Sequence, residues 1–395
     1  MDLNFDQAHL TKVVLNLDHL THNMALLQDH VGKRPLWPAI KANGYGHSAE
    51  IIGSHLVNLG YKTLCVAHVS EAIELTETGL KAKIIVLSPT LAEKSECFVE
   101  YGFEPVVCTL DMARALSHAA SKTGKKIAIH IKVDTGMGRV GIRPDEVVDF
   151  LESCRDYTGI YVKGTMSHFP RAGEEDKSFS MKQIDIFRKV KEASKGYGIK
   201  MYHFANSAAI FDLPDAYFDA ARPGISIYGL KPSPTIANPR VNELKPVLEW
   251  KTRIVYLKEV PAGTGLSYGH IYHTKRTSLI ASIPLGYGDG MSRLLSNRLD
   301  LLVRGARCPQ VGRICMDQCL VDVTALREHV KVGDEVVIIG KQGDDEITAD
   351  ELAERLGTIN YEIVTNIAHR VPRIIFRGQP LISSSPPRRR EIITR

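Results

Sequence analysis

The chain has little net charge, no long apolar run and no basic leader, and each absence excludes a class of protein. Its 395 residues carry a formal net charge of +5, and no apolar run approaches the roughly 20 residues that a membrane-spanning helix needs. The N-terminus is polar and acidic, unlike a secretory signal. The dense basic run at residues 388–390 follows serines and prolines, which is typical of a solvated tail. We therefore expect a cytoplasmic protein with neither a membrane nor a nucleic acid as partner.

The sequence also lacks closely spaced pairs of cysteines. The seven cysteines are odd in number and scattered, without the C-x-x-C spacing of a zinc site. We expect reduced, mostly buried thiols and no metal.

The first half of the chain has the pattern of a parallel barrel. With 44% hydrophobic and 24% charged residues, the chain can form two domains with substantial cores. From residue 34 to about 228, short β-branched runs alternate with amphipathic stretches, as in repeated βα units. The apolar runs are residues 36–40, 63–67, 83–87, 104–107, 127–133, 159–166, 201–204 and 218–221. Eight such runs predict a (β/α)₈ barrel.

The second half reads as a mainly β domain. Prolines mark a connection after residue 230, and strand-like segments follow at residues 248–260, 278–284, 301–303, 319–323 and 335–339. One helix is predicted at residues 348–356, where Thr348 and Glu351 have capping-box spacing. We expect a barrel domain at 1–243, a β-rich domain at 244–382 and a basic tail at 383–395.

Polar residues follow the apolar runs, where a barrel places its active site. Lys41 follows the first run, and burial at a strand end would lower its pKa towards the neutral amine that attacks carbonyls. On position alone, a lysine that reaches solvent is the commoner interpretation. The segments 206–209 and 222–225 follow the seventh and eighth runs, where small residues expose amides to phosphate. A lysine together with a phosphate site matches pyridoxal phosphate.

Several segments resemble motifs of the alanine racemase family, in the family's order. They are AIKANGYGH (residues 39–47), KVDTGMGRVG (132–141), NSAA (206–209), RPGI (222–225), SYG (267–269), GYGDG (286–290), GRICMDQ (312–318) and INYE (359–362). The resemblance covers nearly the whole chain and implies a pyridoxal-phosphate-dependent isomerase that interconverts L- and D-alanine and supplies D-alanine for peptidoglycan. The segment 136–141 also satisfies G-x-G-x-x-G, but it follows the fifth run and does not open a βαβ unit, so a dinucleotide site is not expected.

The resemblance assigns roles to individual residues. Lys41 and Tyr268 would be the two bases, and His168 and Arg293 would favour the tyrosine's phenolate. His168 would also link towards Arg222 at the cofactor's ring nitrogen, where a permanent cation weakens the electron sink. The remaining cofactor contacts are assigned to Tyr45, Arg139, Asn206, Ser207, Gly224, Ile225 and Tyr361.

Further residues are implied for substrate and support. Arg139 would approach the substrate carboxylate, which the Met316 amide would also contact. Lys132 would be carbamylated to orient Arg139, although from the residues alone a buried lysine paired with Asp134 is the simpler interpretation. In the family the second domain of a partner subunit completes each site with Tyr268, Met316 and Asp317, which implies a homodimer.

Three rival interpretations remain. A decarboxylase of similar architecture would carry a cysteine-glutamate-serine motif where residues 312–318 stand, and a barrel-only cofactor carrier would lack the second domain. A broad-specificity racemase for lysine, arginine or serine stays open. The sequence differs from the commonest alanine racemase sequence at Gly44, Pro170 and His270, and these differences leave the substrate range undecided.

Overall fold

The computed structural model describes residues 9–376, which form two compact units. One unit is Asp18–Lys245, and the other combines the described parts of Met1–Leu17 and Pro246–Arg395. Each unit is described below by itself. The predicted basic tail at 383–395 lies outside the described residues.

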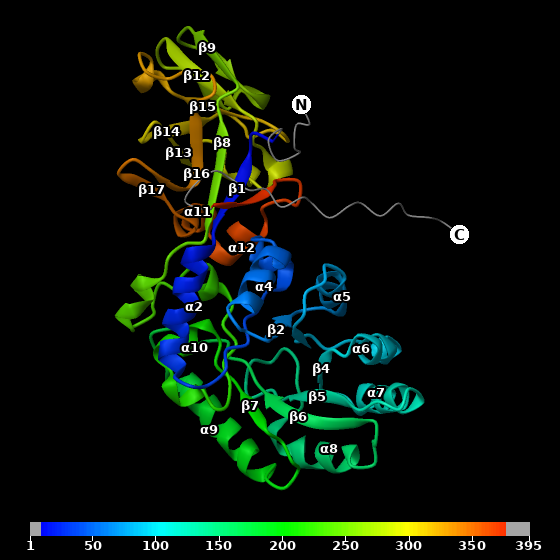
Figure 1. The fold of residues 1–395 in the computed structure, drawn as a ribbon. Coiled ribbons are helices and arrows are strands. Elements are labelled where there is room, and N and C mark those ends of the chain that lie inside the picture. The colour runs from blue at the N-terminus through cyan, green and yellow to red at the C-terminus, as the bar shows by residue number, and fades with distance from the viewer. Residues whose placement is uncertain (1–8, 377–395) are drawn as a thin grey trace, which may run out of the picture. The chain divides into compact units, whose positions relative to one another are not determined.

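The unit Asp18–Lys245 is built around a curled parallel sheet (Figure 1). Its strands occur in chain order, β2-β3-β4-β5-β6-β7, as expected of successive βα units. They are β2 (Thr63–Val66), β3 (Lys83–Val86), β4 (Glu104–Val107), β5 (Ile127–Lys132), β6 (Ile160–Met166) and β7 (Met201–His203).

The first and eighth apolar runs close the ring through single bridges. Ala220 pairs with His203, Leu36 with Ala221, and Ala39 with Cys65. The first run does not form a regular strand because Pro38, which has no backbone N–H to donate to the ladder, lies inside it. The barrel expected from eight runs is confirmed, with two of its eight segments reduced to bridges.

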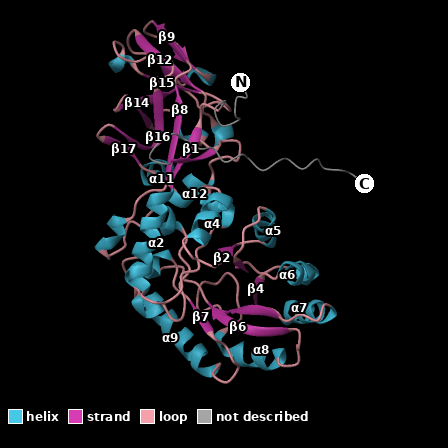
Figure 2. Cartoon of the chain, in the orientation of Figure 1, coloured by secondary structure: helices cyan, strands magenta, loops and turns pink. Residues whose placement is uncertain are grey.

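Helices surround this sheet (Figures 1 and 2). They are α2 (Leu17–Val31), α4 (Ala49–Asn58), α5 (Val69–Glu77), α6 (Ser95–Tyr101), α7 (Leu110–Lys122), α8 (Val147–Cys154), α9 (Ser178–Ala193) and α10 (Ser207–Asp212). Each buries an apolar stripe; α9, for example, buries Ile184, Phe187 and Val190. The amphipathic stretches that alternate with the apolar runs are therefore helices, as expected of βα units.

The other unit is mainly β, as predicted. Its large sheet has the order β18-β1-β8-β16-β13-β14-β15-β12-β9, and β17 pairs with β16. The strands are β1 (Lys12–Asn16), β8 (Leu248–Arg253), β9 (Tyr256–Val260), β12 (Ser278–Ile283), β13 (Asp300–Val303), β14 (Ala306–Val311), β15 (Cys319–Asp322), β16 (Glu335–Gln342), β17 (Asp345–Ile347) and β18 (Arg373–Phe376). A separate pair is formed by β10 (Gly265–Leu266) and β11 (Tyr272–His273).

Two details of this unit differ from the sequence-based expectation. Strand β1 lies between β18 and β8, with Val13 and Leu15 fully buried, so this segment belongs to the β-rich unit and not to the barrel. The predicted run 248–260 is two strands, because β8 pairs with β16 whereas β9 pairs with β12.

The predicted capped helix is present. Helix α11 (Ala349–Leu356) begins after Thr348, whose Oγ1 accepts the Glu351 N–H at 3.0 Å. A further helix, α12 (Asn360–Thr365), was not predicted; the Asn360 side chain ties it to α11 by donating to Asp350 at 2.7 Å.

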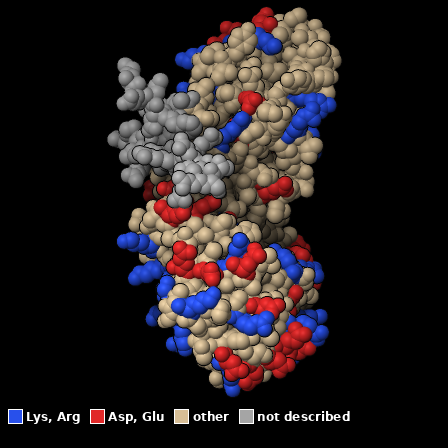
Figure 3. All heavy atoms as spheres, turned by 90° about the vertical axis from the view of Figure 1, so that its right-hand side faces the viewer, with Lys and Arg blue, Asp and Glu red and all other residues tan. Residues whose placement is uncertain are grey.

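Within residues 9–376, no helix is long and apolar enough to cross a membrane. The same residues contain no cluster of three or more His, Cys, Asp or Glu side chains that could hold a metal ion. Acidic and basic side chains lie intermingled on the face of the barrel unit drawn in Figure 3. That face therefore does not present a surface of one sign.

Candidate active site

Lys41 begins a short turn, α3 (Lys41–Tyr45), whose backbone is left-handed. Ala42, Asn43, Gly44 and Tyr45 have φ angles of 50°, 52°, 63° and 51°. Such a conformation costs about 1–2 kcal/mol per non-glycine residue, and strain of this kind gathers at functional sites. Burial, with a smaller contribution from Arg139, lowers the pKa of Lys41. The turn therefore presents an amine that loses its proton more readily than a solvated lysine.

Glu71 holds this turn from the side. Its carboxylate accepts the N–H of Ala42 at 2.5 Å and those of Ala67 and His68 at 2.7 and 2.9 Å. These charge-assisted hydrogen bonds join α3 to the connection between β2 and α5. Glu71 also raises the pKa of Lys41 and so partly opposes the effect of burial.

Cationic groups gather at the carboxyl ends of the barrel strands. Burial, followed by Arg222 and Arg139, lowers the pKa of Lys132 to about 7. Burial and the nearby Lys132, Arg222, Arg139 and Lys41 hold the pKa of His168 well below its ordinary value. Burial lowers the pKa of Arg222 to about 10. The predicted residues of strands one, five, six and eight thus influence one another electrostatically.

A second group of predicted residues surrounds Gly224. A Cβ on Gly224 would meet the Tyr45 hydroxyl at 2.6 Å, so only glycine allows this approach. The Ser207 Oγ accepts the N–H of Gly224 at 2.8 Å and that of Ser226 at 3.4 Å. The Ser226 hydroxyl is buried without a hydrogen-bond partner in the described part of the chain. Hydroxyls and backbone amides thus converge where the seventh and eighth runs end.

Neighbouring elements fix the positions of these groups. Asn206 caps α10, with its Oδ1 accepting the Ala209 N–H at 3.0 Å, and this places Ser207 in the first turn of that helix. Ile225 is fully buried and begins a 3₁₀ turn, Ile225–Tyr228.

In the β-rich unit, Tyr268 lies on a short exposed turn. Its side chain is 72% exposed, and its neighbours Ser267 and Gly269 have φ angles of 60° and 71°. The Ser267 Oγ donates to the carbonyl oxygen of Arg313 at 2.7 Å, which ties this turn to the loop of Met316.

Met316 and Asp317 are held by an arginine outside the predicted set. Arg370 forms ion pairs with Asp317 and with the buried Asp289, both at 2.8 Å. The amides of Tyr287 and Gly288 donate to the carbonyls of Cys315 and Met316 at 3.0 and 2.8 Å. Met316 remains 53% exposed on a fixed backbone.

The other two predicted residues of this unit are placed as follows. Arg293 begins a 3₁₀ turn, Arg293–Leu295, whose next residue, Ser296, accepts the N–H of Ile314 at 3.0 Å. The turns of Tyr268, Arg293 and Met316 are therefore linked by hydrogen bonds. Tyr361 lies on α12.

Two family models match this chain. Residues 15–232 match the family described as alanine racemase, N-terminal domain, and residues 247–375 match alanine racemase, C-terminal domain. The chain belongs to the alanine racemase family. The resemblance seen in the sequence is thereby confirmed, as is its implication of an isomerase.

Relatives and solved structures of this family align along nearly the whole chain. The alanine racemase of Halothermothrix orenii is 45% identical over 91% of this chain and 95% of its own. Alanine racemase 2 of Caldanaerobacter subterraneus is 42% identical over 95% and 97%. The alanine racemase structure of Clostridium difficile 630 has a TM-score of 0.91 at 33% identity, covering 95% and 98%. That of Bacillus anthracis with bound L-Ala-P has 0.89 at 34%, covering 95% and 97%.

Sequence reasoning assigned no role to three residues that organise this family member's site. Glu71 fixes the lysine turn, His203 accepts a hydrogen bond from Arg222 at 2.6 Å, and Arg370 fixes the Met316 loop. His203 lies within the seventh apolar run, at residues 201–204. Glu71 and Arg370 had no local signal, because each acts on a segment distant in sequence.

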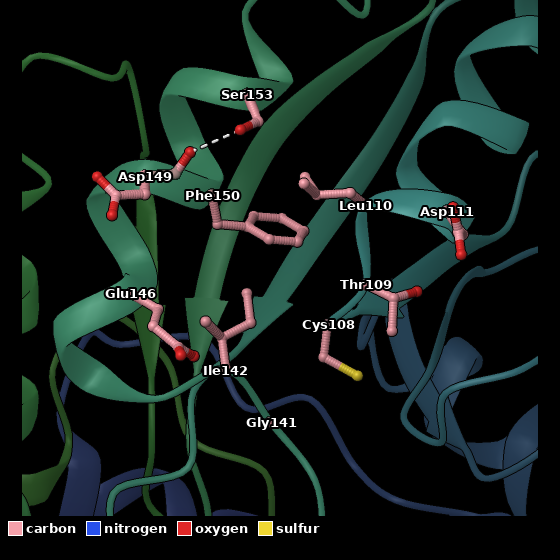
Figure 4. A pocket seen from close by; sticks show the side chains of 10 residues that line it. All are labelled: Cys108, Thr109, Leu110, Asp111, Gly141, Ile142, Glu146, Asp149, Phe150 and Ser153. Atoms are coloured by element: carbon pink, nitrogen blue, oxygen red, sulfur yellow. Dashed lines mark hydrogen bonds between the residues drawn. The ribbon is translucent and has the colours of Figure 1, made fainter.

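Figure 4 shows a pocket on the barrel unit. It is lined by residues of the β4–α7 junction, by Gly141 and Ile142, and by Glu146 and residues along α8, and none of the predicted site residues lines it. Its carboxylates come from Asp111, Glu146 and Asp149. The pocket is therefore not assigned to catalysis.

Proposed function

We propose that this chain binds pyridoxal phosphate and interconverts L- and D-alanine by a two-base mechanism. The proposal depends on two features that occur in the same barrel. One is Lys41 on a strained turn, and the other is the set of hydroxyl and amide groups around Gly224. The first suits a covalent bond to an aldehyde and the second suits a phosphate.

The residues around Gly224 fit the phosphate of this cofactor. The approach of Tyr45 to Gly224 leaves no room for a Cβ, and the buried Ser226 hydroxyl has an unused hydrogen-bonding capacity within the described part of the chain. Tyr45, Ser207, the Gly224 and Ile225 amides, Asn206 and Tyr361 would hold or support the phosphate, and Lys41 would carry the aldehyde carbon.

When bound, pyridoxal phosphate supplies a conjugated ring that accepts the electron pair left on the α-carbon. Arg222 would face its ring nitrogen. The guanidinium stays charged, because burial lowers its pKa only to about 10. A permanent donor at this nitrogen discourages its protonation and so limits transamination relative to racemisation.

Racemisation needs one proton removed from one face of the α-carbon and one returned to the other. Lys41 would hold or release a proton at Nζ on one face, helped by its lowered pKa. Tyr268 would do so at its hydroxyl on the other face, with His168 and Arg293 supporting the phenolate.

Arg139 and the Met316 amide would bind the substrate carboxylate, and Arg139 would also contact the cofactor's phenolic oxygen. Carbamylation of Lys132 would help to orient Arg139. In that step the neutral amine attacks carbon dioxide: the N–C bond forms as one C=O π bond breaks, and the nitrogen gives up one proton to water, which leaves a carbamate anion. The pKa of about 7 makes the neutral amine available near neutral pH.

A homodimer is part of the proposal. Tyr268 and Met316 are 72% and 53% exposed, on turns that are nevertheless held firmly. In a dimer a partner's Tyr268, Met316 and Asp317 would complete each barrel site. A cytoplasmic location and supply of D-alanine to peptidoglycan follow from the family and belong to the same proposal.

The test is enantiomer interconversion with a panel of L-alanine, L-serine, L-lysine and L-arginine. The proteins are wild type, Lys41→Ala, Tyr268→Phe and, as a matched control, Tyr256→Phe, an exposed tyrosine of the same unit. We expect D-alanine to be the leading product of the wild type. Lys41→Ala and Tyr268→Phe should lose activity, and the control Tyr256→Phe should keep it.

Other outcomes contradict parts of the proposal. A leading basic substrate or serine would indicate a broad-specificity racemase, and release of carbon dioxide without D-product would indicate a decarboxylase. Full activity of Tyr268→Phe would contradict the two-base mechanism.

A further inference from the structure

A continuous chain of polar side chains crosses the interior of the barrel. Lys163 binds the Glu104 carboxylate at 2.6 and 2.7 Å, and Glu104 bonds to His130 Nε2 at 2.9 Å. His130 Nδ1 lies 2.9 Å from His203 Nε2, and His203 Nδ1 lies 2.6 Å from Arg222 Nη1. Glu104 begins β4 and Arg222 follows the eighth run, so the chain connects opposite ends of the parallel strands.

The hydrogen-bond donors and acceptors of this chain allow one consistent direction. The Glu104 carboxylate can only accept, so His130 carries its proton on Nε2 and offers Nδ1 as an acceptor. His203 therefore donates from Nε2 and accepts at Nδ1, where Arg222 can only donate. Both histidines are neutral in this arrangement. The directions of their pKa shifts agree, since burial lowers the pKa of each.

The surrounding residues leave space for this chain and fix its rings. His130 and His203 are fully buried, and Trp37 contacts both rings edge to face at centroid distances of 5.8 and 4.8 Å. A Cβ on Gly164 would meet His130 Nδ1 at 2.4 Å, so this position must be glycine for the ring to stand there. The register of β5 against β6 shifts at His130. A buried ion pair between Glu104 and Lys163 alone would not require the glycine at position 164 or the register shift at His130.

We propose that Glu104, supported by Lys163, is a positioning residue that acts through His130 and His203 to orient the Arg222 guanidinium towards the ring nitrogen of pyridoxal phosphate. This inference rests on the proposed function. Arg222 uses its other donors on backbone carbonyls, with Nη1 and Nη2 at 2.7 Å from the oxygens of His203 and Ser167. The acceptor at His203 Nδ1 therefore completes the set that holds the guanidinium.

The decisive variant is Glu104→Gln, which keeps the size of the side chain but can donate. Lys163 can only donate and therefore takes the amide oxygen, so the amide N–H faces His130 Nε2. This moves the His130 proton to Nδ1 and the His203 proton to Nδ1. The N–H of His203 would then face the N–H of Arg222, and the guanidinium must shift. We expect a changed absorption spectrum of the bound cofactor, at least a tenfold lower kcat and more transamination per racemisation event, by analogy with other tautomer-fixing carboxylates.

Two variants separate this effect from loss of an ion pair. Glu104→Asp keeps the acceptor and should largely restore the spectrum. Asp212→Asn is the matched control, because Asp212 is also buried and pairs with a lysine, Lys177, at 2.7 Å, with side-chain exposures of 2% and 21%. It should lose thermal stability and keep the wild-type spectrum and product ratio.

The results distinguish this inference from the proposed function. A wild-type protein that neither binds pyridoxal phosphate nor racemises alanine removes the proposed function. A functional wild type with Glu104→Gln unchanged in spectrum and product ratio overturns only the role of Glu104. If Glu104→Gln does not fold, Lys163→Met takes its place: a smaller spectral change in the same direction supports the inference, and an unchanged spectrum overturns it.

Discussion

Two buried lysines show how one side chain type acquires different properties within a barrel. Lys41 is pulled towards the neutral form by burial and Arg139, and Glu71 opposes this. Lys132 is more completely buried, and its cationic neighbours Arg222 and Arg139 lower its pKa further, to about 7. Both lysines lose their proton more readily than a solvated lysine, and the neutral amines are suited to an aldehyde in the first case and to carbon dioxide in the second.

The Lys132 pKa predicts how stability depends on pH. Between pH 7 and the ordinary lysine pKa of 10.5, the unfolded chain binds more protons at this site than the folded one, so stability rises with pH. Below pH 7 the cost of burying the charge is fully present. Lys132→Met, in bicarbonate-free buffer, should therefore be more stable at pH 7 by on the order of 2 kcal/mol. It should also show a weaker rise of Tm between pH 7 and 9. A wild-type Tm that rises no more steeply than the variant's would contradict this.

Gly224 gives a prediction about packing. Gly224→Ala places a Cβ 2.6 Å from the Tyr45 hydroxyl, so we expect cofactor affinity to fall at least tenfold, measured by fluorescence titration. The fold should lose about 1–3 kcal/mol. Tyr45→Phe removes the clashing oxygen, and in the double variant the two losses should not add. Additive losses would show that Tyr45 is not the group displaced.

Sequence alone could indicate some of these residues and not others. Lys41 and Arg222 stand directly after apolar runs and Ser207 follows shortly after the seventh, where the barrel pattern places functional groups. Glu71 acts on the turn of Lys41 through a hydrogen bond between residues 29 positions apart. Glu104 acts on Arg222 through two intervening histidines. No periodic pattern records such contacts.

At the scale of elements, the left-handed turn α3 is the most strained segment of the candidate site. Two non-glycine, non-asparagine residues, Ala42 and Tyr45, adopt positive φ within it. Hydrogen bonds offset this strain: Glu71 accepts the Ala42 N–H, and the Asn43 Oδ1 accepts the Ala49 N–H at 2.9 Å. The turn therefore depends on the carboxylate of a neighbouring element.

Glu71→Gln tests this dependence. A glutamine can accept at only one of the two carboxylate oxygens, so at least one backbone N–H at Ala42, Ala67 or His68 loses its partner. We expect a loss of about 1–3 kcal/mol in unfolding free energy, measured by denaturant titration. The pKa of Lys41 should fall further, because the charge that raises it is gone. Glu74→Gln, on the same helix, is the control, and equal stability of the two variants would contradict the role of Glu71.

The elements that sequence predicted share one property. Long buried runs, such as β5 and β6, and helices with a clear apolar stripe, such as α7 and α9, carry a periodic signal of their own. The short elements β10, β17 and α12 were not identified, because each spans too few residues to carry a periodic signal of its own. The break between β8 and β9 was not visible because it is set by their different partners, β16 and β12, which lie far along the chain.

At the scale of the whole molecule, the chain order and the units do not coincide. Strand β1 precedes the barrel in sequence but lies in the large sheet of the β-rich unit, hydrogen-bonded to β8 and β18. Both ends of the described chain thus belong to one unit. A short first strand has too little local signal to reveal its partners, so the sequence did not indicate that β1 pairs with β8 and β18.

The proposed dimer makes a prediction that single variants cannot test. If Lys41 of one chain works with Tyr268 of its partner, a heterodimer of Lys41→Ala and Tyr268→Phe has one intact site and one doubly altered site. Purified through two different tags, it should show about half of the wild-type activity. The matched control pairs wild type with the chain carrying both substitutions. If sites are completed across subunits, both sites of this control are damaged and it is inactive. If each site lies within one chain, the control is half active and the first heterodimer is inactive.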